Sequence, residues 1–153
     1  VGKHDFLDGA EKVNEYLKKE GYENTSYQST LHPSSSPKLN LGVIIRQRSG
    51  TAESFWKKFS GGECVSEEAS AEMLELLMNQ KNTAKIPAGI SADIPIANKT
   101  GETDSDQHDM AIVYGPKTTY ILCVMSEDFK SGSEAIDNIR SISGVVYNYL
   151  NLS

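Results

Sequence analysis

The tripeptide Lys99-Thr100-Gly101 places a cation, a hydroxyl and a residue without a side chain at the end of an apolar, strand-like run. The Lys99 ammonium supplies positive charge, and the Thr100 hydroxyl can donate a hydrogen bond to a carboxylate. Gly101 lets a substrate backbone lie against the strand, as an added strand would. The peptide N–H of Glu102 can then face a carbonyl oxygen that becomes an oxyanion. These residues predict a site that binds a carboxylate-bearing acyl substrate.

The surroundings of this tripeptide resemble those found in the serine β-lactamases and penicillin-binding proteins, whose signature motifs are S-x-x-K, S-D-N and K-T-G. Ile86-Pro87-Ala88-Gly89 lies shortly before the tripeptide, and strands are expected after it, over 109–115 and 119–126. A long final helix follows, and the family orders its C-terminal half in this way. The resemblance, which begins near residue 8, implies an α+β fold: a helical segment joined to a three-stranded antiparallel sheet with a C-terminal helix.

The function implied by the resemblance is acyl transfer from a β-lactam or a D-Ala-D-Ala-like amide to a serine. Lys99 would bind the substrate carboxylate and assist proton transfer, and Glu102 would give one oxyanion-hole N–H, so these two are the predicted catalytic residues. Thr100 and Gly101 are the predicted substrate-binding residues. No cofactor is expected. The alternative is a non-catalytic ligand-binding or interaction module that retains the K-T-G strand.

A nucleophilic serine in such a site needs a lysine one helical turn further on. The sequence holds two such pairs, Ser35 with Lys38 and Ser54 with Lys57. Prolines flank Ser35 and oppose the helix that the geometry needs, and no S-x-N follows Ser54 before Lys99. Neither pair has the family's order of motifs, so the nucleophile motif is predicted to be missing from this chain, which alone should be inactive.

Residues 36–40, Ser-Pro-Lys-Leu-Asn, resemble the family's loop element Glu-Pro-x-Leu-Asn, with Ser36 in place of the glutamate. In class A β-lactamases that glutamate activates the water that hydrolyses the acyl-enzyme. A serine hydroxyl without a neighbouring base cannot do this at neutral pH, and no carboxylate occurs between Glu23 and Glu53. Asn40 can still orient a water and is predicted to be in the substrate site. Either these residues form a fortuitous turn, or deacylation is slow.

The elements that must position the site follow from apolar spacing. A first helix is predicted from Asp8 to a C-cap at Gly21, and a second from about Thr51. A third is predicted after Ser66, with Leu76 among its inward-facing residues, and a last helix over 133–150. On that last helix the stripe Ile136, Ile139, Ile142, Val146 and Tyr149 is predicted to face the core. The stretch over 24–52 is rich in Ser, Pro and Asn and predicts a long loop. The strand over 109–115 is apolar on both faces, which indicates helices on both sides of the sheet.

A single domain over 1–153 is expected from the length. A mainly helical part with the long loop would occupy 1–85, and the sheet with the C-terminal helix 86–153. The family's full catalytic unit is much longer, and in it the strand equivalent to 119–126 is central. That strand is apolar on both faces, so the chain is expected to pair with the N-terminal half of the same fold or to self-associate through this edge.

Composition restricts the partners and the compartment. A net charge of −6 and a sequence pI near 5.1 argue against nucleic acid, and no apolar run is long enough for a membrane span. His4, His32 and His108 show no metal-ligand spacing, so no metal is expected. The run over 102–109 lacks the Gly and Glu of a calcium loop. The resemblance implies a bacterial extracytoplasmic protein, secreted or membrane-anchored, although no signal is visible, and a β-lactam or peptidoglycan-like substrate.

Overall fold

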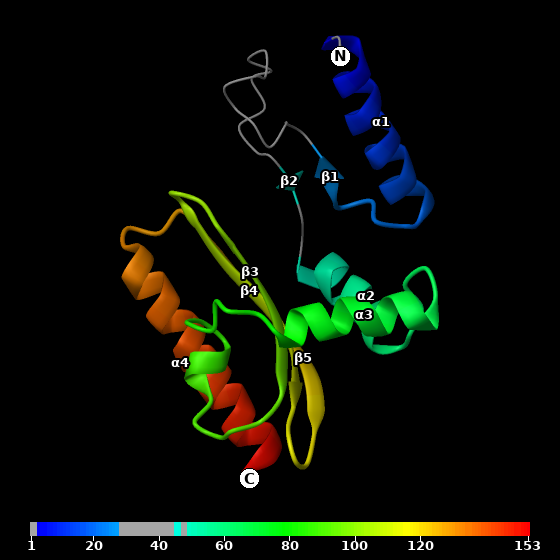
Figure 1. The fold of residues 1–153 in the computed structure, drawn as a ribbon. Helices are drawn as coiled ribbons and strands as arrows, with labels where there is room; N and C mark the ends of the chain where they lie inside the picture. The colour runs from blue at the N-terminus through cyan, green and yellow to red at the C-terminus, as the bar shows by residue number, and fades with distance from the viewer. Residues whose placement is uncertain (1–2, 28–44, 47–48) are drawn as a thin grey trace. The chain divides into compact units, whose positions relative to one another are not determined.

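A computed structural model describes residues 3–27, 45–46 and 49–153 (Figure 1). The chain divides into two compact units, Val1–Thr51 and Ala52–Ser153. We describe each unit by itself, and the single domain over the whole chain stays a prediction.

The first unit begins with a helix that is longer than predicted. Helix α1 spans Lys3–Lys19, so Asp8 lies inside it and does not cap its start, and that prediction is wrong. The predicted end is confirmed at Gly21, which has a φ of 81°. Its N–H donates to the Lys18 carbonyl oxygen at 3.1 Å. Glycine adopts this left-handed conformation without the steric cost that a Cβ brings, and it therefore ends the helix.

Two short strands follow in the same unit, where the sequence predicted a long loop with one short apolar run. Strand β1 (Ser26–Tyr27) pairs antiparallel with β2 (Ile45–Arg46). Ile45 belongs to a short apolar run, and pairing between strands distant in sequence leaves little local signal. Residues 28–44 lie outside the described part of the chain, and with them lie the predicted site residue Asn40 and its neighbour Ser36.

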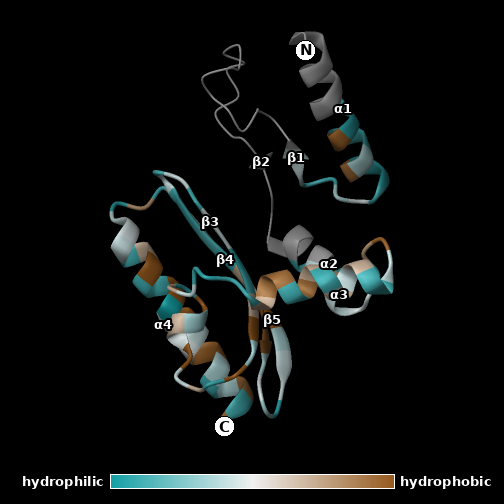
Figure 2. Ribbon diagram, in the orientation of Figure 1, coloured by the Kyte–Doolittle hydropathy of each residue, from teal (hydrophilic) through white to brown (hydrophobic). Residues whose placement is uncertain are grey.

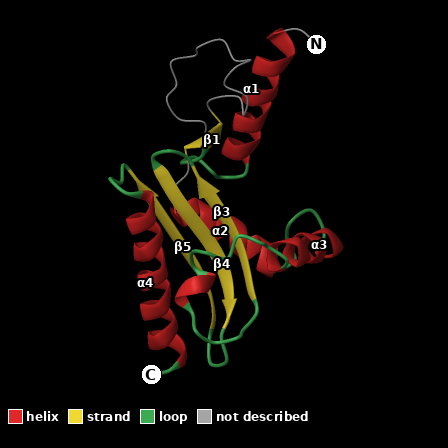
Figure 3. Cartoon of the chain, turned by 60° about the vertical axis from the view of Figure 1, so that its left-hand side comes forward, coloured by secondary structure: helices red, strands yellow, loops and turns green. Residues whose placement is uncertain are grey.

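The second unit is built on a three-stranded antiparallel sheet in the order β3-β4-β5 (Figure 3). The strands are β3 (Ile96–Glu102), β4 (Asp106–Tyr114) and β5 (Thr119–Glu127). In the register Gly101 faces His108 across the β3–β4 ladder. The predicted α+β fold class, with a helical segment, this sheet and a C-terminal helix, is confirmed.

Three helices and a short 3-10 turn accompany the sheet. They are α2 (Ser49–Ser60), α3 (Glu67–Met78), the turn η1 (Pro87–Gly89) and α4 (Gly132–Asn151). Helix α3 begins where predicted, because the Ser66 hydroxyl accepts a hydrogen bond from the Ala69 N–H at 3.1 Å. Leu76 on the same helix was predicted to face inward but is exposed.

Apolar side chains pack on both faces of the sheet, which confirms the prediction that helices lie on both of its sides. On one face Ala111 and Val113 pack with Ile139 and Tyr147 of α4 and with the residues around η1. On the other face Ile112 packs with Trp56 of α2. Figure 2 shows hydrophobic residues along the strands and along α4. The sheet is therefore a central layer between α4 on one side and α2 with α3 on the other.

The face that α4 turns to the sheet differs from the predicted stripe. Its buried residues are Ala135, Ile139, Ser143, Tyr147 and Asn151. Ile139 belongs to both sets, whereas Ile142 is 44% exposed and Tyr149 is 75% exposed, so their prediction as core residues is wrong. Small residues explain the shift: a Cβ on Gly89 would lie 2.2 Å from the Arg140 carbonyl oxygen. The helix approaches the η1 turn along a seam that hydrophobicity alone does not mark.

Among the described helices, none is both long enough and apolar enough to cross a lipid bilayer.

Candidate active site

Strand β3 carries four of the five predicted site residues and lies at one edge of the three-stranded sheet. Successive side chains of a strand point to opposite faces. Lys99 therefore lies on the face that carries Trp56 and α2. Thr100 and Glu102 lie on the face of α4. A carboxylate that contacts both Lys99 and Thr100 must sit at the strand edge, where side chains from the two faces can meet.

The hydrogen-bond register decides which backbone groups of β3 face outward. The Thr103 N–H donates to the Asp106 carbonyl oxygen at 3.0 Å, and the Tyr114 N–H donates to the Pro95 carbonyl oxygen at 3.1 Å. In an antiparallel ladder hydrogen-bonded residues alternate with residues that are not bonded across the pair. Gly101 is bonded to β4, and the N–H of Glu102 points to the open edge. This edge therefore offers the donor that the sequence predicted.

The Lys99 side chain reaches the same edge. It is exposed, and its ammonium donates to the carbonyl oxygen of Thr100, which the register directs outward. A cation and an outward-facing N–H thus lie along one open strand edge. An anionic ligand with a carbonyl group can meet both.

Gly101 is not required by packing inside the protein. A Cβ at this position would lie 3.7 Å from the Cβ and Cδ2 atoms of His108, which is ordinary contact. Among the described residues, no neighbour of Gly101 therefore requires this position to lack a side chain. Its predicted use, to let a substrate backbone approach, stays a prediction.

A buried polar cluster that no sequence motif predicted lies behind the K-T-G end of β3. The Asp109 carboxyl accepts hydrogen bonds from the Ile86 N–H at 2.9 Å and from Asn98 Nδ2 at 3.1 Å. The Lys85 ammonium donates to the carbonyl oxygens of Gly101 and His108. Asn98 and Asp109 are diagonal neighbours across the β3–β4 ladder, whereas Lys85 comes from the connection before η1. In the sequence Asp109 ends the polar run over 102–109 and Lys85 follows the largely polar stretch over 79–83, so no local pattern marked them as buried.

Burial raises the pKa of the Asp109 carboxyl, although the hydrogen bonds from Asn98 and Ile86 and the charge of Lys85 oppose this. A carboxylate that loses water is disfavoured relative to its protonated form. Perturbed acids of this kind gather near functional sites, although structural clusters also produce them. Here the carboxyl lies beneath the strand that carries the predicted site.

The serine–lysine pair on α2 is exposed, and its lysine is paired with a neighbouring carboxylate. Ser54 and Lys57 are exposed, and the Lys57 ammonium lies 2.8 Å from the Glu53 carboxylate. The Lys57 ammonium is therefore paired with a carboxylate of its own helix. The other pair, Ser35 with Lys38, lies outside the described residues.

Metal binding finds no support in the residues that the structure describes, where no group of three or more His, Cys, Asp or Glu side chains could hold an ion. In the hairpin that joins β3 to β4, the Asp106 carboxylate accepts a hydrogen bond from the Thr103 hydroxyl at 2.6 Å. That carboxylate stabilises the turn. His108 lies within β4, where its Nδ1 accepts a hydrogen bond from the Ser126 N–H at 3.3 Å.

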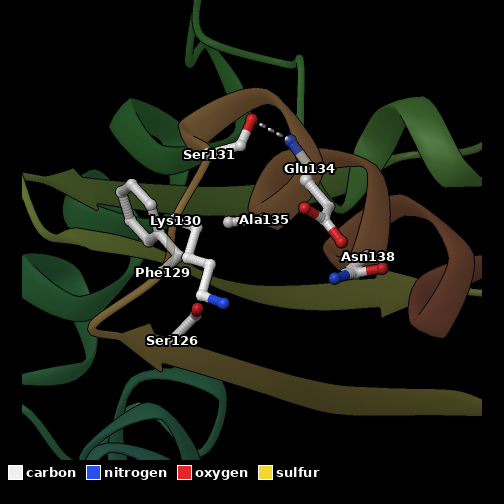
Figure 4. A pocket seen from close by; sticks show the side chains of 7 residues that line it. All are labelled: Ser126, Phe129, Lys130, Ser131, Glu134, Ala135 and Asn138. Carbon is white, nitrogen blue, oxygen red and sulfur yellow. Dashed lines mark hydrogen bonds between the residues drawn. The ribbon is translucent and has the colours of Figure 1, made fainter.

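A small pocket of about 210 Å³ lies between the end of β5 and the start of α4 (Figure 4). Its polar side chains are Ser126, Lys130, Ser131, Glu134 and Asn138, and Phe129 and Ala135 complete it. The Ser131 hydroxyl is already used as the cap of α4, where it accepts from the Glu134 N–H. The pocket contains none of the predicted site residues.

Comparison with known proteins supports the family assignment. The sequence matches the β-lactamase enzyme family over residues 5–150. No match was found among curated protein sequences. Solved structures of similar fold include PBP-A, at 22% identity and a TM-score of 0.76 over 95% of this chain and 52% of that one.

The TLA-1 extended-spectrum β-lactamase is 19% identical, with a TM-score of 0.81 over 95% of this chain and 56% of that one. A variant of PBP-A, solved as an acyl-enzyme complex with penicillin G, is 20% identical, with a TM-score of 0.70 over 95% of this chain and 53% of that one. The chain thus spans about half the length of these solved structures. The chain shares the fold of the matched part of these structures, and the family match covers nearly all of the chain's residues. The chain belongs to the β-lactamase enzyme family.

Proposed function

We propose that this chain is part of a penicillin-recognising acyl hydrolase of the serine β-lactamase type, acting on β-lactam or D-Ala-D-Ala-like amides. The observation that carries the proposal is the outer edge of β3, along which the Lys99 ammonium contacts the Thr100 carbonyl oxygen and the Glu102 N–H points outward. Lys99 binds the substrate carboxylate and assists proton transfer, and Glu102 gives an oxyanion N–H. Thr100 donates to the carboxylate at the strand edge, and Gly101 leaves room for the substrate backbone. A similar fold, that of a PBP-A variant, carries penicillin G as an acyl-enzyme.

The nucleophile is expected from a part of the fold that precedes these residues. The exposed Ser54, whose neighbouring lysine is held by Glu53, does not fill that role. This chain alone therefore binds but does not turn over a β-lactam. If residues 36–40 are the family's loop element and not a fortuitous turn, deacylation is slow when the chain is joined to its N-terminal half, because Ser36 stands where that element has a glutamate.

The family also supports proposals about compartment and assembly. An extracytoplasmic, bacterial protein with a role in β-lactam resistance or peptidoglycan chemistry fits the family. Strand β5 has its second edge unpaired among the described strands. We expect this edge to pair with the N-terminal half of the fold or with another copy of the chain.

Covalent labelling with a fluorescent penicillin tests the proposal. The chain alone should remain unlabelled and should not hydrolyse nitrocefin, whereas the chain joined to its preceding half should be labelled. Nitrocefin turnover by the chain alone that Ser54→Ala abolishes would show that the nucleophile lies on α2. A full-length protein that binds penicillin without labelling would favour the non-catalytic binding module.

Calorimetry of Lys99→Ala tests the position of the ligand. The variant should bind a β-lactam more weakly by about tenfold or more, because a charge-assisted hydrogen bond contributes roughly 1.5–3 kcal/mol. Lys81→Ala is the matched control, since Lys81 is an exposed lysine on the connection between α3 and η1. Equal affinities in the two variants would place the ligand elsewhere.

A further inference from the structure

The Lys85 ammonium is buried beneath the end of β3, which is unusual for a lysine. The residue is 1% exposed. Its Nζ atom lies 3.2 Å from the Gly101 carbonyl oxygen and 3.1 Å from the His108 carbonyl oxygen. The Glu102 carboxylate is more distant, at 3.5 Å, and its side chain is 59% exposed. The backbone carbonyls, and not the exposed carboxylate, are therefore the closer partners of this buried charge.

The segment that carries Lys85 is held on both sides, so the ammonium is placed before any ligand arrives. Arg140 Nε of α4 donates to the Ala84 carbonyl oxygen at 2.7 Å. The Ser143 hydroxyl donates to the Ile86 carbonyl oxygen at 2.8 Å. The Ile86 N–H in turn donates to Asp109 in β4. Helix α4 and the sheet together fix the residues before and after Lys85.

One of these two carbonyls, that of Gly101, belongs to the peptide group whose N–H is the proposed oxyanion donor. The Gly101 C=O and the Glu102 N–H are parts of a single planar trans amide. Their bonds point in opposite directions, so a contact that fixes the carbonyl toward β4 also fixes the N–H toward the open edge. Hydrogen bonding to the carbonyl oxygen draws electron density from the nitrogen, and this makes the N–H a stronger donor.

We propose that Lys85 is a positioning residue that orients and polarises the Gly101–Glu102 peptide from behind, and so strengthens the N–H that stabilises the oxyanion. The proposal rests on the proposed function for its catalytic consequence. Its physical part, a polarised peptide, is independent of any activity. The ammonium touches no substrate, because it lies within the protein and acts through the amide.

Nuclear magnetic resonance of the isolated chain tests the physical part. In Lys85→Met, which keeps the length of the side chain but removes the charge, the Gly101 carbonyl ¹³C and the Glu102 amide ¹⁵N signals should both move upfield. In Lys85→Arg, which keeps a cationic donor, they should stay closer to those of the unaltered protein. Lys81→Met is the matched control and should leave both signals in place.

Two further measurements separate this role from simple structural support. Glu102→Gln removes the ion pair with Lys85 but leaves the contacts of Lys85 with the two carbonyl oxygens. The ¹³C chemical shift of the Gly101 carbonyl should therefore stay close to that of the unaltered protein. If Lys85→Met fails to fold, a scalar coupling across the hydrogen bond, from Lys85 Nζ to the Gly101 carbonyl carbon in the unaltered protein, decides the matter. A folded Lys85→Met with both signals unchanged, or the absence of that coupling, would overturn the proposal.

The catalytic part is measured in a preparation that fluorescent penicillin labels, such as the chain joined to its preceding half. Lys85→Met should slow acylation about tenfold with little change in penicillin affinity, less than the roughly 100- to 1,000-fold loss that follows removal of a whole oxyanion donor. If the unaltered protein is not labelled, the proposed function fails while the resonance data still decide the role of Lys85. If labelling is unchanged in a variant whose peptide signals have moved, the polarisation is real but without catalytic effect, and the catalytic part is wrong.

Discussion

Replacing Gly89 by alanine tests how closely α4 approaches the η1 turn. A Cβ at Gly89 would lie 2.2 Å from the Arg140 carbonyl oxygen and 2.9 Å from Ser143 Cβ. Ordinary non-bonded separations are about 3.5–4.0 Å, so the two segments must part by roughly 1 Å. Because the oxygen belongs to the helix backbone, no side-chain rotation relieves the contact. The helix or the turn has to move.

The cost of that movement can be worked from the contacts that it disturbs. Overpacking a well-packed contact costs about 1–3 kcal/mol. Parting the segments also lengthens the hydrogen bonds from Ser143 to Ile86 and from Arg140 to Ala84, each contributing about 1 kcal/mol. Gly89→Ala should therefore lower the free energy of unfolding by about 3–5 kcal/mol, a large part of the usual 5–15 kcal/mol.

Urea unfolding followed by Trp56 fluorescence and by circular dichroism measures this. Trp56 is the chain's single tryptophan and is buried on the opposite face of the sheet, so it reports unfolding and not the local change. Gly132→Ala is the matched control, since its added Cβ meets Phe129 at 3.5 Å, an ordinary contact, and alanine suits the first turn of α4. Protein concentration is kept equal because self-association shifts the midpoint. A Gly89→Ala protein as stable as Gly132→Ala would refute the close approach.

Three further outcomes are expected. Ser66→Ala removes the cap of α3 and should lower the free energy of unfolding by about 1 kcal/mol in urea titrations, and no change would mean that the cap is replaced by water. Because burial raises the pKa of Asp109 above the ordinary 3.8, the native state keeps this proton to higher pH than the unfolded chain. The unfolding free energy should thus fall as pH rises from about 3.8 through the native pKa. Asp109→Asn should weaken this dependence of the unfolding free energy on pH, as measured by thermal unfolding at several pH values. An unaltered dependence would mean that other groups cause it. Sedimentation should show that the isolated chain associates through the Thr119–Ser126 edge. Cys123→Pro should weaken this association, because the register directs the Cys123 N–H away from β4 and toward that edge. A sharp monomer peak with protected amides along β5 would contradict this prediction.

Much of the fold could be predicted because its signals are local. Ser66 caps α3 through a residue three positions on, and Gly21 ends α1 through its own backbone conformation. The strand that carries Lys99 was predicted from its apolar residues and from the K-T-G motif at its end. In each case the physical cause lies within a few residues of the element that it explains.

The errors arose where distant residues decide the outcome. Ile142 and Tyr149 are apolar at helical spacing, yet α4 buries Ser143 and Tyr147, because Gly89 gives room for the backbone of α4 on that side. Likewise, Lys85 lies 16 residues from the carbonyl of Gly101 that it contacts. No periodicity connects such positions, and only the tertiary structure brings them together.

The contact between the Lys99 ammonium and the Thr100 carbonyl oxygen has a consequence for solubility. An open strand edge offers its carbonyls and N–H groups to any passing strand, and a lysine on the edge discourages aggregation. Here the lysine covers one acceptor on the edge that the proposed substrate would use. If the proposed function holds, Lys99 would serve both ligand binding and protection from aggregation. Loss of this lysine would leave the Thr100 carbonyl oxygen open to neighbouring chains.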